Sequence, residues 1–503
     1  MQPQTDTSVQ IPLIIDLEEA AATMNEVFMS MKHSVLLKPN PAWKDRFVRL
    51  DRLENMILEN KERIEAVIYT DFGCRDAFVT DMLDIFPTLS QIRYLKKNAE
   101  KWMKPRSFVP DPYLLPGSEE VIFQPKGVVG IIAPWNYPLF LSIGSVAQAF
   151  AAGNLCMLKL SETTPVFSSL IEELVQKYFM PNELYVVLGE SDISSRFAEL
   201  PFDHLLFIGS TQVGRKVAQS AAKNLTPVTL ELGGKSPAVI APNYPLDAAV
   251  ERIMVGKLLN SGQTCIAPDY VLIERRRVRN FVDICRKEAR KLYPAGLADP
   301  SYTSIVSQSR FESLLNQLQE ASQTSKVESL FLGDQFDLKT RKLGPQIVLN
   351  PPPDIEVMSE EIFGPILPVI AYPDDDIGEA VDFINSRPHP LAMYWFDNNK
   401  KRVKNIVSTV PCGGITVNDT ILHAVSHNLP FGGVGQSGMG RYMGKAGFES
   451  FSNLKSVFYQ SKLNFVDTFN PPYSEKAHSI VKSMIQGKSM LSILLKKDKE
   501  QDE

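Results

Sequence analysis

The sequence predicts an α/β protein with two lobes, each built around a sheet of mostly parallel strands. From about residue 121, short apolar runs bounded by Gly, Pro and Asn alternate with segments long enough to form helices. This alternation is typical of buried parallel strands joined by crossover helices. The chain has 503 residues, which is more than one ordinary domain holds. The paired glycines 233–234 offer a hinge between the lobes, because glycine permits conformations that side chains forbid.

The N-terminal third begins with amphipathic helices, and strands then alternate with helices to about residue 417. Met24, Val27, Phe28 and Met31 recur at helical spacing. The first lobe is expected to have strands at 128–133, 155–160, 184–188 and 204–208, with helices at 139–152, 166–179 and 213–223. The second lobe is expected to have strands at 238–241, 270–274, 366–372 and 414–417. The glycine at 153 is a signal for the end of the helix before it.

The composition excludes several classes of protein. Hydrophobic residues make up 44% and charged residues 22% of the chain, so neither a disordered nor a multi-span membrane protein is expected. Lys and Arg number 53 and Asp and Glu 58, which leaves no basic excess that would favour nucleic acid as a partner. No secretory signal is recognised, and no apolar run approaches the length of a membrane-spanning helix. We therefore expect a cytoplasmic protein that acts on a small molecule.

The C-terminal tail predicts an amphipathic helix. Ile480 and Met484 form one of three apolar pairs at helical spacing between residues 480 and 495, and Lys496, Lys497 and Lys499 follow. We expect this helix to dock on the protein or on a second copy of it, rather than on a membrane surface.

The five cysteines are spread along the chain without a C-x-x-C pair, which favours reduced thiols over a disulfide framework or a zinc site. Cys265 differs from the others because it lies in a small polar segment, 260–268 (NSGQTCIAP), where a substrate can reach it. A catalytic thiol must become a thiolate, so it needs a base or a positive field nearby. The other four cysteines fit the usual structural role of a buried thiol.

Glu231 and a glycine turn are further candidates, each with a structural alternative. Glu231 has apolar neighbours at the lobe junction, where a carboxylate is costly unless it is functional or held in a buried ion pair. Residues 207–214 (FIGSTQVG) run from a strand through Gly209 into a helix, which suits anion binding but also suits a simple tight turn. His423 and His427 have the spacing of two helical metal ligands, but no third ligand accompanies them, so no metal site is expected.

Seven segments together resemble the aldehyde dehydrogenase superfamily, because they occur in the family's order and approximate spacing. They are 133–138 (APWNYP), 159–162 (KLSE), 209–214 (GSTQVG), 231–235 (ELGGK), 262–265 (GQTC), 360–365 (EEIFGP) and 430–435 (PFGGVG). Within the family, 417–420 (VNDT) and 429–439 resemble the class 3 branch. Residues 265–270 (CIAPDY) and 471–473 (PPY) look most like the bacterial coniferyl aldehyde dehydrogenases of that branch.

The resemblance implies a catalytic role for three residues. Cys265 matches the nucleophile that adds to the aldehyde carbon. The Asn136 side-chain amide and the Cys265 backbone N–H match the groups that hold the resulting oxyanion. Glu231 matches the general base that activates water to hydrolyse the thioester. The implied reaction is oxidation of an aldehyde to its acid through a thiohemiacetal and a thioester.

The resemblance also implies NAD as cofactor, with NADP left open. Lys159 and Glu162 match residues that hydrogen-bond the adenosine ribose, and Glu162 would repel a 2′-phosphate. Leu160 departs from the proline that many members have after the lysine. The positions that match cofactor-binding residues are Trp135, Lys159, Glu162, Gly209, Ser210, Val213, Leu232, Glu361 and Phe363.

The substrate is expected to be an apolar or aromatic aldehyde, with coniferyl aldehyde favoured and a long-chain fatty aldehyde as the alternative. Tyr137, Leu141, Ile266 and Phe431 are candidates for lining its tunnel, although core packing explains each of them equally well. A cysteine esterase that uses no nucleotide and a catalytically silent binding homologue are alternatives from other classes. A CoA-acylating dehydrogenase normally lacks a base such as Glu231.

The resemblance implies a set of domain boundaries and a homodimer. A Rossmann-type NAD(P)-binding domain is expected at 1–106 and 124–232, and a catalytic domain at 233–417. A small β oligomerisation segment is expected at 107–123 and 418–460, with a hairpin arm joined by a strand near the C-terminus. The remaining residues, 461–503, are expected to hold the tail helix.

Overall fold

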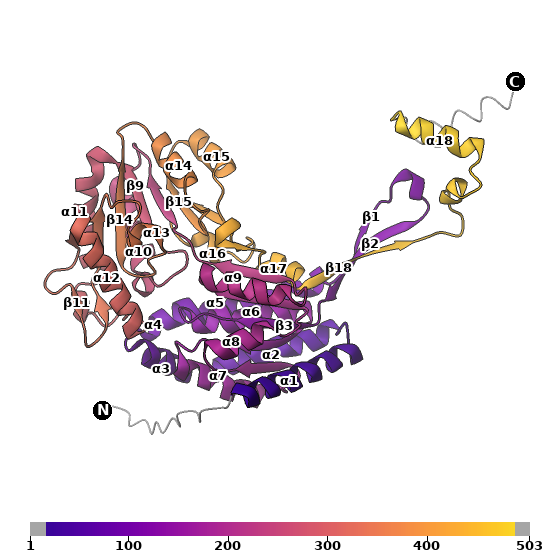
Figure 1. Ribbon diagram of the computed structural model, residues 1–503, viewed down its shortest axis with the longest axis horizontal. Coiled ribbons are helices and arrows are strands. Elements are labelled where there is room, and N and C mark those ends of the chain that lie inside the picture. Colours follow the sequence, from indigo (N-terminus) through magenta and orange to yellow (C-terminus); the bar gives the residue numbers. More distant parts are fainter. Residues whose placement is uncertain (1–16, 488–503) are drawn as a thin grey trace. The chain divides into compact units, whose positions relative to one another are not determined.

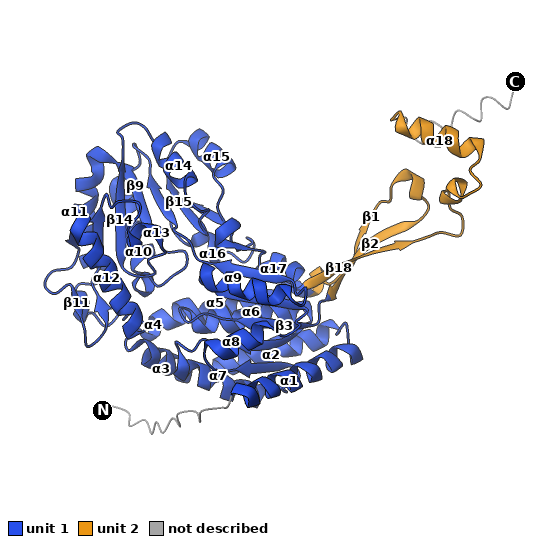
Figure 2. Cartoon of the chain, viewed as in Figure 1, with its two compact units in different colours: residues 1–99, 125–451 blue, residues 100–124, 452–503 orange. Residues whose placement is uncertain are grey.

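The structure is a computed structural model that describes residues 17–487. Over that range the chain forms two compact units, one from the stretches up to 99 and from 125 to 451, the other from 100–124 and the stretch after 451 (Figure 2). The larger unit holds two large sheets with helices packed around them. The predicted α/β fold class is confirmed, whereas the domain boundaries implied by the resemblance stay a prediction.

The first sheet of the larger unit has six strands in the order β17-β7-β6-β3-β4-β5. Figure 1 labels its strand β3, which lies among helices. All neighbouring pairs are parallel except the pair that the two-residue strand β17 makes with β7. The strands are almost entirely buried, as expected for a parallel sheet with helices on both faces. Their bounds are β3 Val128–Ile132, β4 Leu155–Lys159, β5 Leu184–Val187, β6 His204–Gly209, β7 Val228–Leu232 and β17 Gly438–Met439.

Helix α1, one of the helices around this sheet, follows the predicted apolar spacing. Met24, Phe28 and Met31 of α1 are buried in the core with residues of β3 to β7. Helix α6 ends at Gly153, whose φ of 96° lies in the left-handed region that a C-terminal glycine favours. The bounds are α1 Leu17–Leu37, α2 Trp43–Glu59, α3 Lys61–Phe72, α4 Ala77–Thr80, α5 Phe86–Trp102, α6 Pro138–Ala152, α7 Pro165–Tyr178, α8 Ser191–Ala198, α9 Thr211–Ala222 and α17 Gly444–Ser450.

The second sheet of the larger unit has seven strands in the order β10-β13-β14-β9-β8-β15-β16, parallel except for β10. Its strands are β8 Pro237–Ile240, β9 Tyr270–Glu274, β10 Lys326–Ser329, β13 Gln346–Leu349, β14 Ile366–Tyr372, β15 Ala392–Phe396 and β16 Gly414–Val417. The helices are α10 Leu246–Leu258, α11 Val278–Leu292, α12 Gln308–Thr324, α13 Glu356–Ser359, α14 Gly378–Asn385, α15 Lys400–Thr409 and α16 Leu422–Val425. A separate short pair is formed by β11 Phe336–Asp337 and β12 Lys342–Leu343.

Strands β13 and β15 are two elements of this second sheet that the sequence patterns did not indicate. Both are short apolar runs, QIVL and AMYWF. Periodicity alone does not distinguish such a run from a turn of buried helix, because every position is apolar or fully covered. The predicted strands of the second lobe, by contrast, correspond to β8, β9, β14 and β16.

The smaller unit contains a three-stranded sheet in the order β1-β2-β18 and the last described helix. Strands β1 Arg106–Phe108 and β2 Ser118–Pro125 pair antiparallel, and β18 Ser452–Tyr459 lies on the other side of β2. Helix α18 Glu475–Ile485 is capped by Ser474, whose hydroxyl accepts a hydrogen bond from the Ala477 backbone N–H. The later part of the predicted tail helix, with its apolar pair and three lysines, lies outside the described residues. Within residues 17–487, no helix is long and apolar enough to cross a membrane.

Candidate active site

The carboxyl edge of the six-stranded sheet collects several of the predicted cofactor-binding positions. Strands β4, β6 and β7 end at Lys159, Gly209 and Leu232, and Trp135 lies shortly after the end of β3. Because these strands are parallel neighbours, their carboxyl ends meet at one edge. In open α/β sheets ligands bind outside this edge. The fold therefore brings together residues that lie far apart in the sequence.

Helix α9 begins directly after β6 and presents its amino terminus at the same edge. Ser210 is the N-cap, and its Oγ accepts a hydrogen bond from the Val213 backbone N–H at 3.4 Å. A Cβ on Gly209 would lie 2.5 Å from the Phe207 ring, so this turn is tight as well as exposed. The first turn of a helix has N–H groups without intrahelical partners, which together with the helix dipole favour an anion.

Lys159, the last residue of β4, and Glu162 lie side by side. Lys159 Nζ is 3.6 Å from a carboxylate oxygen of Glu162 and donates a hydrogen bond to the Leu160 carbonyl at 2.6 Å. Burial lowers the pKa of Lys159, while the Glu162 carboxylate opposes that shift. The Leu160 backbone N–H donates to the Val187 carbonyl at 3.3 Å. A proline at position 160 could not make that hydrogen bond, so the departure from the family pattern leaves the loop with one more tether to β5.

The loop that carries Cys265 is strained and firmly held. Asn260 and Ser261 have φ values of 51° and 52°, which non-glycine residues rarely adopt and which cluster at functional sites. Gln263 fastens the loop, because its amide donates to the Ser304 carbonyl at 3.0 Å and to the Asn260 carbonyl at 3.0 Å. Such tethers fix the position of the thiol two residues later.

Cys265 lies among acidic groups. Burial raises the pKa of its thiol to about 12, and the negative charges of Glu361 and Glu231 add to the shift. Hydrogen bonds from the backbone N–H groups of Cys265 and Ile266 oppose it. The thiol is therefore protonated at neutral pH in this state, and it needs a base before it can act as a nucleophile.

Glu231 is buried in β7, with 3% of its surface exposed. Neither of its carboxylate oxygens has a hydrogen-bond partner among the residues that the structure describes. Burial raises the pKa of Glu231 well above its ordinary value, and the positive charge of Arg441 offsets only part of that shift. Among the described residues, Glu231 is therefore not held in a buried ion pair, which was the structural alternative for it.

Asn136 lies against the Cys265 loop. Its side-chain Nδ2 donates to the Gln263 carbonyl at 3.2 Å. Its own backbone carbonyl accepts hydrogen bonds from Arg75 Nη1 at 3.1 Å and from Asn260 Nδ2 at 3.2 Å. The structure thus joins the segment after β3 to the segment before β9 at the position expected for the nucleophile.

Glu361 and Phe363 approach the same place from the other lobe. Burial, and then the charge of Asp269, raises the pKa of Glu361 to about 8, although a hydrogen bond from the Gly234 backbone lowers it. Phe363 has a φ of 52°, and its ring meets the Trp135 ring edge to face at a centroid separation of 5.4 Å. Residues from both lobes therefore meet beside Cys265.

The four predicted pocket residues are all buried, and two of them adjoin the nucleophile loop. The Tyr137 hydroxyl hydrogen-bonds to the Thr264 hydroxyl, and the Ile266 carbonyl accepts a hydrogen bond from the Tyr394 hydroxyl. Phe431 packs against Tyr442 at a centroid separation of 6.2 Å. Leu141 lies in the first turns of α6. Burial alone does not distinguish a tunnel wall from core packing.

Tyr442 is a candidate that sequence reasoning missed. It is 1% exposed, and its hydroxyl has no hydrogen-bond partner within residues 17–487. Burial raises the pKa of its phenol, and the charges of Glu231 and Cys265 add to the shift, which places Tyr442 near both groups. The sequence signal was weak, since a single tyrosine after the glycine-rich segment 432–440 has no special pattern.

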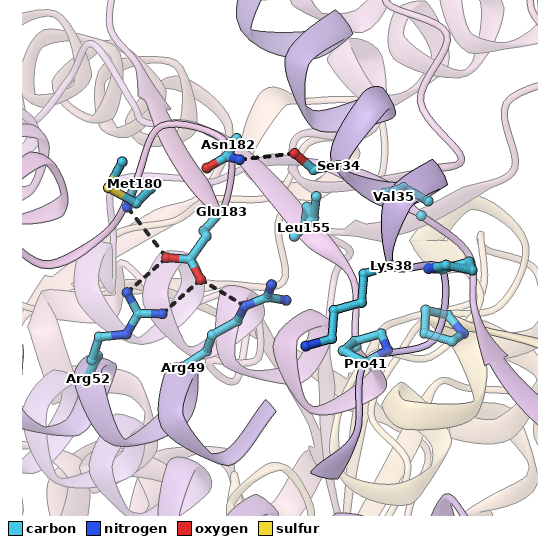
Figure 3. Close-up of a pocket in the computed structure, with 14 residues that line it drawn as sticks. Ser34, Val35, Lys38, Pro41, Arg49, Arg52, Leu155, Met180, Asn182 and Glu183 are labelled. Carbon is cyan, nitrogen blue, oxygen red and sulfur yellow. Dashed lines mark hydrogen bonds and ion pairs between the residues drawn. The ribbon is translucent and has the colours of Figure 1, made fainter. Parts of the chain in front are cut away.

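A separate cavity of about 460 Å³ lies at the opposite, amino-terminal edge of the same sheet (Figure 3). Glu183 lies between Arg49 and Arg52, with oxygen to nitrogen distances of 3.2 and 2.8 Å, and these side chains line the cavity with Lys38. Lys38 itself pairs with Asp45 at 2.8 Å. Each of these charged side chains has an ion-pair partner, with Glu183 shared by two arginines, so this cavity is not assigned to the chemistry.

The two histidines at metal-ligand spacing each hydrogen-bond to a different hydroxyl group. His423 Nδ1 hydrogen-bonds to the Thr416 hydroxyl at 2.8 Å, and His427 Nε2 to the Ser90 hydroxyl at 2.9 Å. Among residues 17–487, no group of three or more His, Cys, Asp or Glu side chains is arranged to hold a metal ion.

Comparison with known proteins identifies the family. The sequence profile described as "Aldehyde dehydrogenase family" matches residues 17–457. A probable coniferyl aldehyde dehydrogenase of Pseudomonas aeruginosa is 41% identical over 469 residues, covering 92% of this chain and 97% of that protein. The substrate-bound structure of Staphylococcus aureus AldH superposes with a TM-score of 0.87 at 33% identity, over 92% of this chain and 99% of the other. PnpE, a protein of Pseudomonas sp. WBC-3, in complex with nicotinamide adenine dinucleotide superposes with a TM-score of 0.79 at 26% identity, over 88% and 91% of the two chains. The chain therefore belongs to the aldehyde dehydrogenase family and is an oxidoreductase that acts on aldehydes.

Proposed function

We propose that this enzyme oxidises an apolar or aromatic aldehyde to the carboxylic acid, with Cys265 as nucleophile and NAD(P) as cofactor. One observation carries the proposal. Asn136, from the segment after β3, and Glu231, from β7, both lie at the loop of Cys265, and Glu231 has no hydrogen-bond partner in the described part of the chain. An unpaired buried carboxylate beside a nucleophile is a candidate base.

The residues at the sheet edge fit a dinucleotide. The amino terminus of α9 and the side-chain-free Gly209 suit a pyrophosphate, because both offer backbone N–H groups without steric hindrance. Glu162 is half exposed and has oxygens available to hydroxyl groups, with the Lys159 ammonium beside it. Bound NAD(P) would supply the acceptor for the hydride that leaves the aldehyde carbon.

The remaining steps use the protein's own groups. In its ionised form Glu231 takes the thiol proton, and the Cys265 sulfur bonds to the aldehyde carbon to give a thiohemiacetal. The Asn136 amide and the Cys265 backbone N–H stabilise the oxygen that gains the charge. Loss of the hydride leaves a thioester. Glu231 passes the thiol proton to solvent and, ionised again, takes a proton from water, whose oxygen attacks the thioester carbon and releases the acid and the Cys265 thiolate.

The cofactor preference is proposed to be NAD over NADP. Glu162 carries a negative charge at the position that would meet a 2′-phosphate, and a carboxylate repels that group while it accepts hydrogen bonds from ribose hydroxyls. Lys159 reduces the repulsion, since its ammonium lies 3.6 Å from the carboxylate. NADP is therefore expected to be used less well, rather than refused.

The leading substrate is coniferyl aldehyde, and a long-chain fatty aldehyde is the alternative. Support for the first comes from the relative at 41% identity that bears this activity in its name. The buried aromatic and aliphatic side chains of Tyr137, Ile266 and Phe431 suit either an aromatic ring or an alkyl chain. We further propose a homodimer, which the molar mass in solution would test.

The test is an assay of the purified protein with NAD and then with NADP over aromatic and aliphatic aldehydes. The expected result is formation of reduced cofactor in equal amount to the acid, with kcat/KM highest for an aromatic aldehyde and NAD. Higher kcat/KM for long-chain aldehydes would favour the alternative substrate. No reduced cofactor with any aldehyde, together with ester hydrolysis in its absence, would point instead to a cysteine esterase.

A further inference from the structure

A fully buried ion pair adjoins the proposed oxyanion site, and the proposed reaction does not use it. Arg75 and Asp84 are both 0% exposed, and Arg75 Nη2 donates to Asp84 Oδ2 at 2.5 Å. Arg75 lies between α3 and α4, and Asp84 lies in the π-helical turn Asp81–Ile85 before α5. Single π turns of this kind are frequent at functional sites.

The pair holds both ends of one short turn. Arg75 Nη1 donates to the Asn136 carbonyl at 3.1 Å. On the other side, Asp84 Oδ1 accepts hydrogen bonds from the backbone N–H groups of Leu139 at 3.0 Å and Phe140 at 3.1 Å. These are N–H groups of the first turn of α6, which have no partners within the helix. Arg75 and Asp84 therefore link the residue that supplies the oxyanion donor to the helix that follows it.

The side chain between those two anchors is also in contact with the pair. Tyr137 stands between Asn136 and the start of α6, and the Arg75 guanidinium lies 5.5 Å from the centre of its ring. The Tyr137 hydroxyl in turn hydrogen-bonds to Thr264, next to Cys265. Arg75 thus contacts both Asn136 and Tyr137, two consecutive residues whose side chains hydrogen-bond to the nucleophile loop.

A gain in stability is a poor explanation for this arrangement. Taking two charges out of water costs several kcal/mol for each ion, and a well-packed apolar pair often replaces a buried ion pair without loss. The Arg75 charge is matched by Asp84, so it does not act as a long-range field on the substrate. The pair instead fixes geometry. Its hydrogen bonds are directional, so they hold the Asn136 backbone in one position.

We propose that Arg75, held by Asp84, is a positioning residue that sets the Asn136 amide at the distance needed to bind the oxyanion. This inference rests on the proposed role of Asn136. A misplacement of a catalytic group by about 1 Å costs on the order of 100-fold in rate. Arg75→Lys keeps the charge but loses the forked geometry that spans Asn136 and Asp84. We expect it to lower kcat by about 10- to 100-fold with little change in the dissociation constant for NAD(P).

Arg46→Lys is the matched control. Arg46 is also 0% exposed, and it donates to the Ala151 carbonyl at the opposite end of α6 at 3.1 Å and to the Pro41 carbonyl at 3.0 Å. Loss of this arginine should lower the melting temperature as much as loss of Arg75, while kcat stays within about twofold of the wild type. Asp84→Asn, which removes the charge that orients Arg75, is the second test variant and should reproduce the loss in kcat.

A double-mutant cycle with Asn136→Ala separates positioning from general damage. If Arg75 acts through Asn136, the Arg75→Lys change should cost less than about threefold in kcat once the Asn136 amide is absent. An equal loss in both backgrounds, or a wild-type kcat in both Arg75→Lys and Asp84→Asn, would overturn the positioning role and leave the proposed function intact. Full activity of Asn136→Ala itself would overturn the oxyanion assignment and this inference together. A wild-type protein that reduces no cofactor with any aldehyde would instead refute the proposed function.

Discussion

The Glu361 carboxylate occupies the space that a side chain on Gly233 would need. A Cβ atom built on Gly233 would lie 1.8 Å from Glu361 Oε2, which is far inside van der Waals contact. Gly233 follows the last residue of β7 in the first lobe, and Glu361 belongs to the segment before β14 in the second. The absence of a side chain at one lobe therefore permits a buried carboxylate of the other lobe to reach the site.

Gly233→Ala should displace Glu361 and weaken the contact with the cofactor that the family resemblance implies for it. The backbone of Gly233 is not in the left-handed region, so the effect would be steric rather than conformational. We expect the KM for NAD to rise by about tenfold, which corresponds to about 1.4 kcal/mol of binding free energy. Gly378→Ala, at the exposed start of α14, is the control and should leave KM unchanged. An unchanged KM in both variants would show that Glu361 does not bind the cofactor.

Cys265→Ser should abolish turnover and leave cofactor binding in place. The serine hydroxyl is a much weaker nucleophile than a thiolate, so we expect kcat to fall by on the order of 10⁴-fold. Binding of NAD, followed by quenching of protein fluorescence, should be within about twofold of the wild type. Cys285→Ser, in a buried cysteine on α11, is the matched control and should keep activity. Substantial turnover by Cys265→Ser would refute the assigned nucleophile.

Glu231→Gln should stall the enzyme after the first half of the reaction. If Glu231 activates the water that hydrolyses the thioester, its loss should slow steady-state turnover by about 10²- to 10⁴-fold. Rapid-mixing experiments should then show a burst of reduced cofactor approaching one per active site, and mass spectrometry should detect the acylated enzyme. Glu231 is also the proposed base for the thiol, so a slower burst would still agree with its role in hydrolysis. Unchanged steady-state oxidation would contradict that role.

Glu231 should also make the stability of the protein depend on pH. Its folded-state pKa is raised, so between the ordinary carboxyl pKa and that raised value the folded protein keeps a proton that the unfolded chain loses. Below about pH 4.5 the protonated carboxyl makes its whole contribution to the free energy of unfolding. This contribution declines as the pH rises through the window. Glu231→Gln carries no charge to bury, so its melting temperature relative to the wild type should be higher at pH 8 than at pH 5. Thermal scans without cofactor at both pH values would check this, and an equal difference at both would contradict it.

Glu162→Gln should shift the enzyme from NAD toward NADP. Removal of the negative charge eliminates the repulsion of a 2′-phosphate and leaves Lys159 free to attract it. We expect the ratio of kcat/KM for NADP to that for NAD to rise by about tenfold, or about 1.4 kcal/mol in relative binding. Glu173→Gln removes an exposed carboxylate that pairs with Arg63 on the surface and should not change the ratio. A ratio that is the same in both variants would mean that Glu162 does not face the ribose.

Several elements could be predicted from local patterns, because a local pattern is enough to specify them. Met24, Phe28 and Met31 recur at helical spacing and form the buried face of α1. Gly153 ends α6 because the left-handed conformation there requires no side chain. Strands β13 and β15 were missed, since short buried runs such as QIVL and AMYWF carry no periodicity that separates strand from helix.

The sequence by itself determined the alternating strands and helices, the family, and the small polar loop that isolates Cys265 from the other thiols. These features depend on neighbouring residues and on motifs of fixed spacing. Only the tertiary structure decided that Glu231 has no ion-pair partner among the described residues, and that Asn136 meets a loop 127 positions later. It also decided that Arg75 and Asp84 hold both ends of the turn after β3. Contacts of this kind arise when packed sheets and helices fix distant backbone segments against each other, and no local pattern records which partner a buried polar group will find.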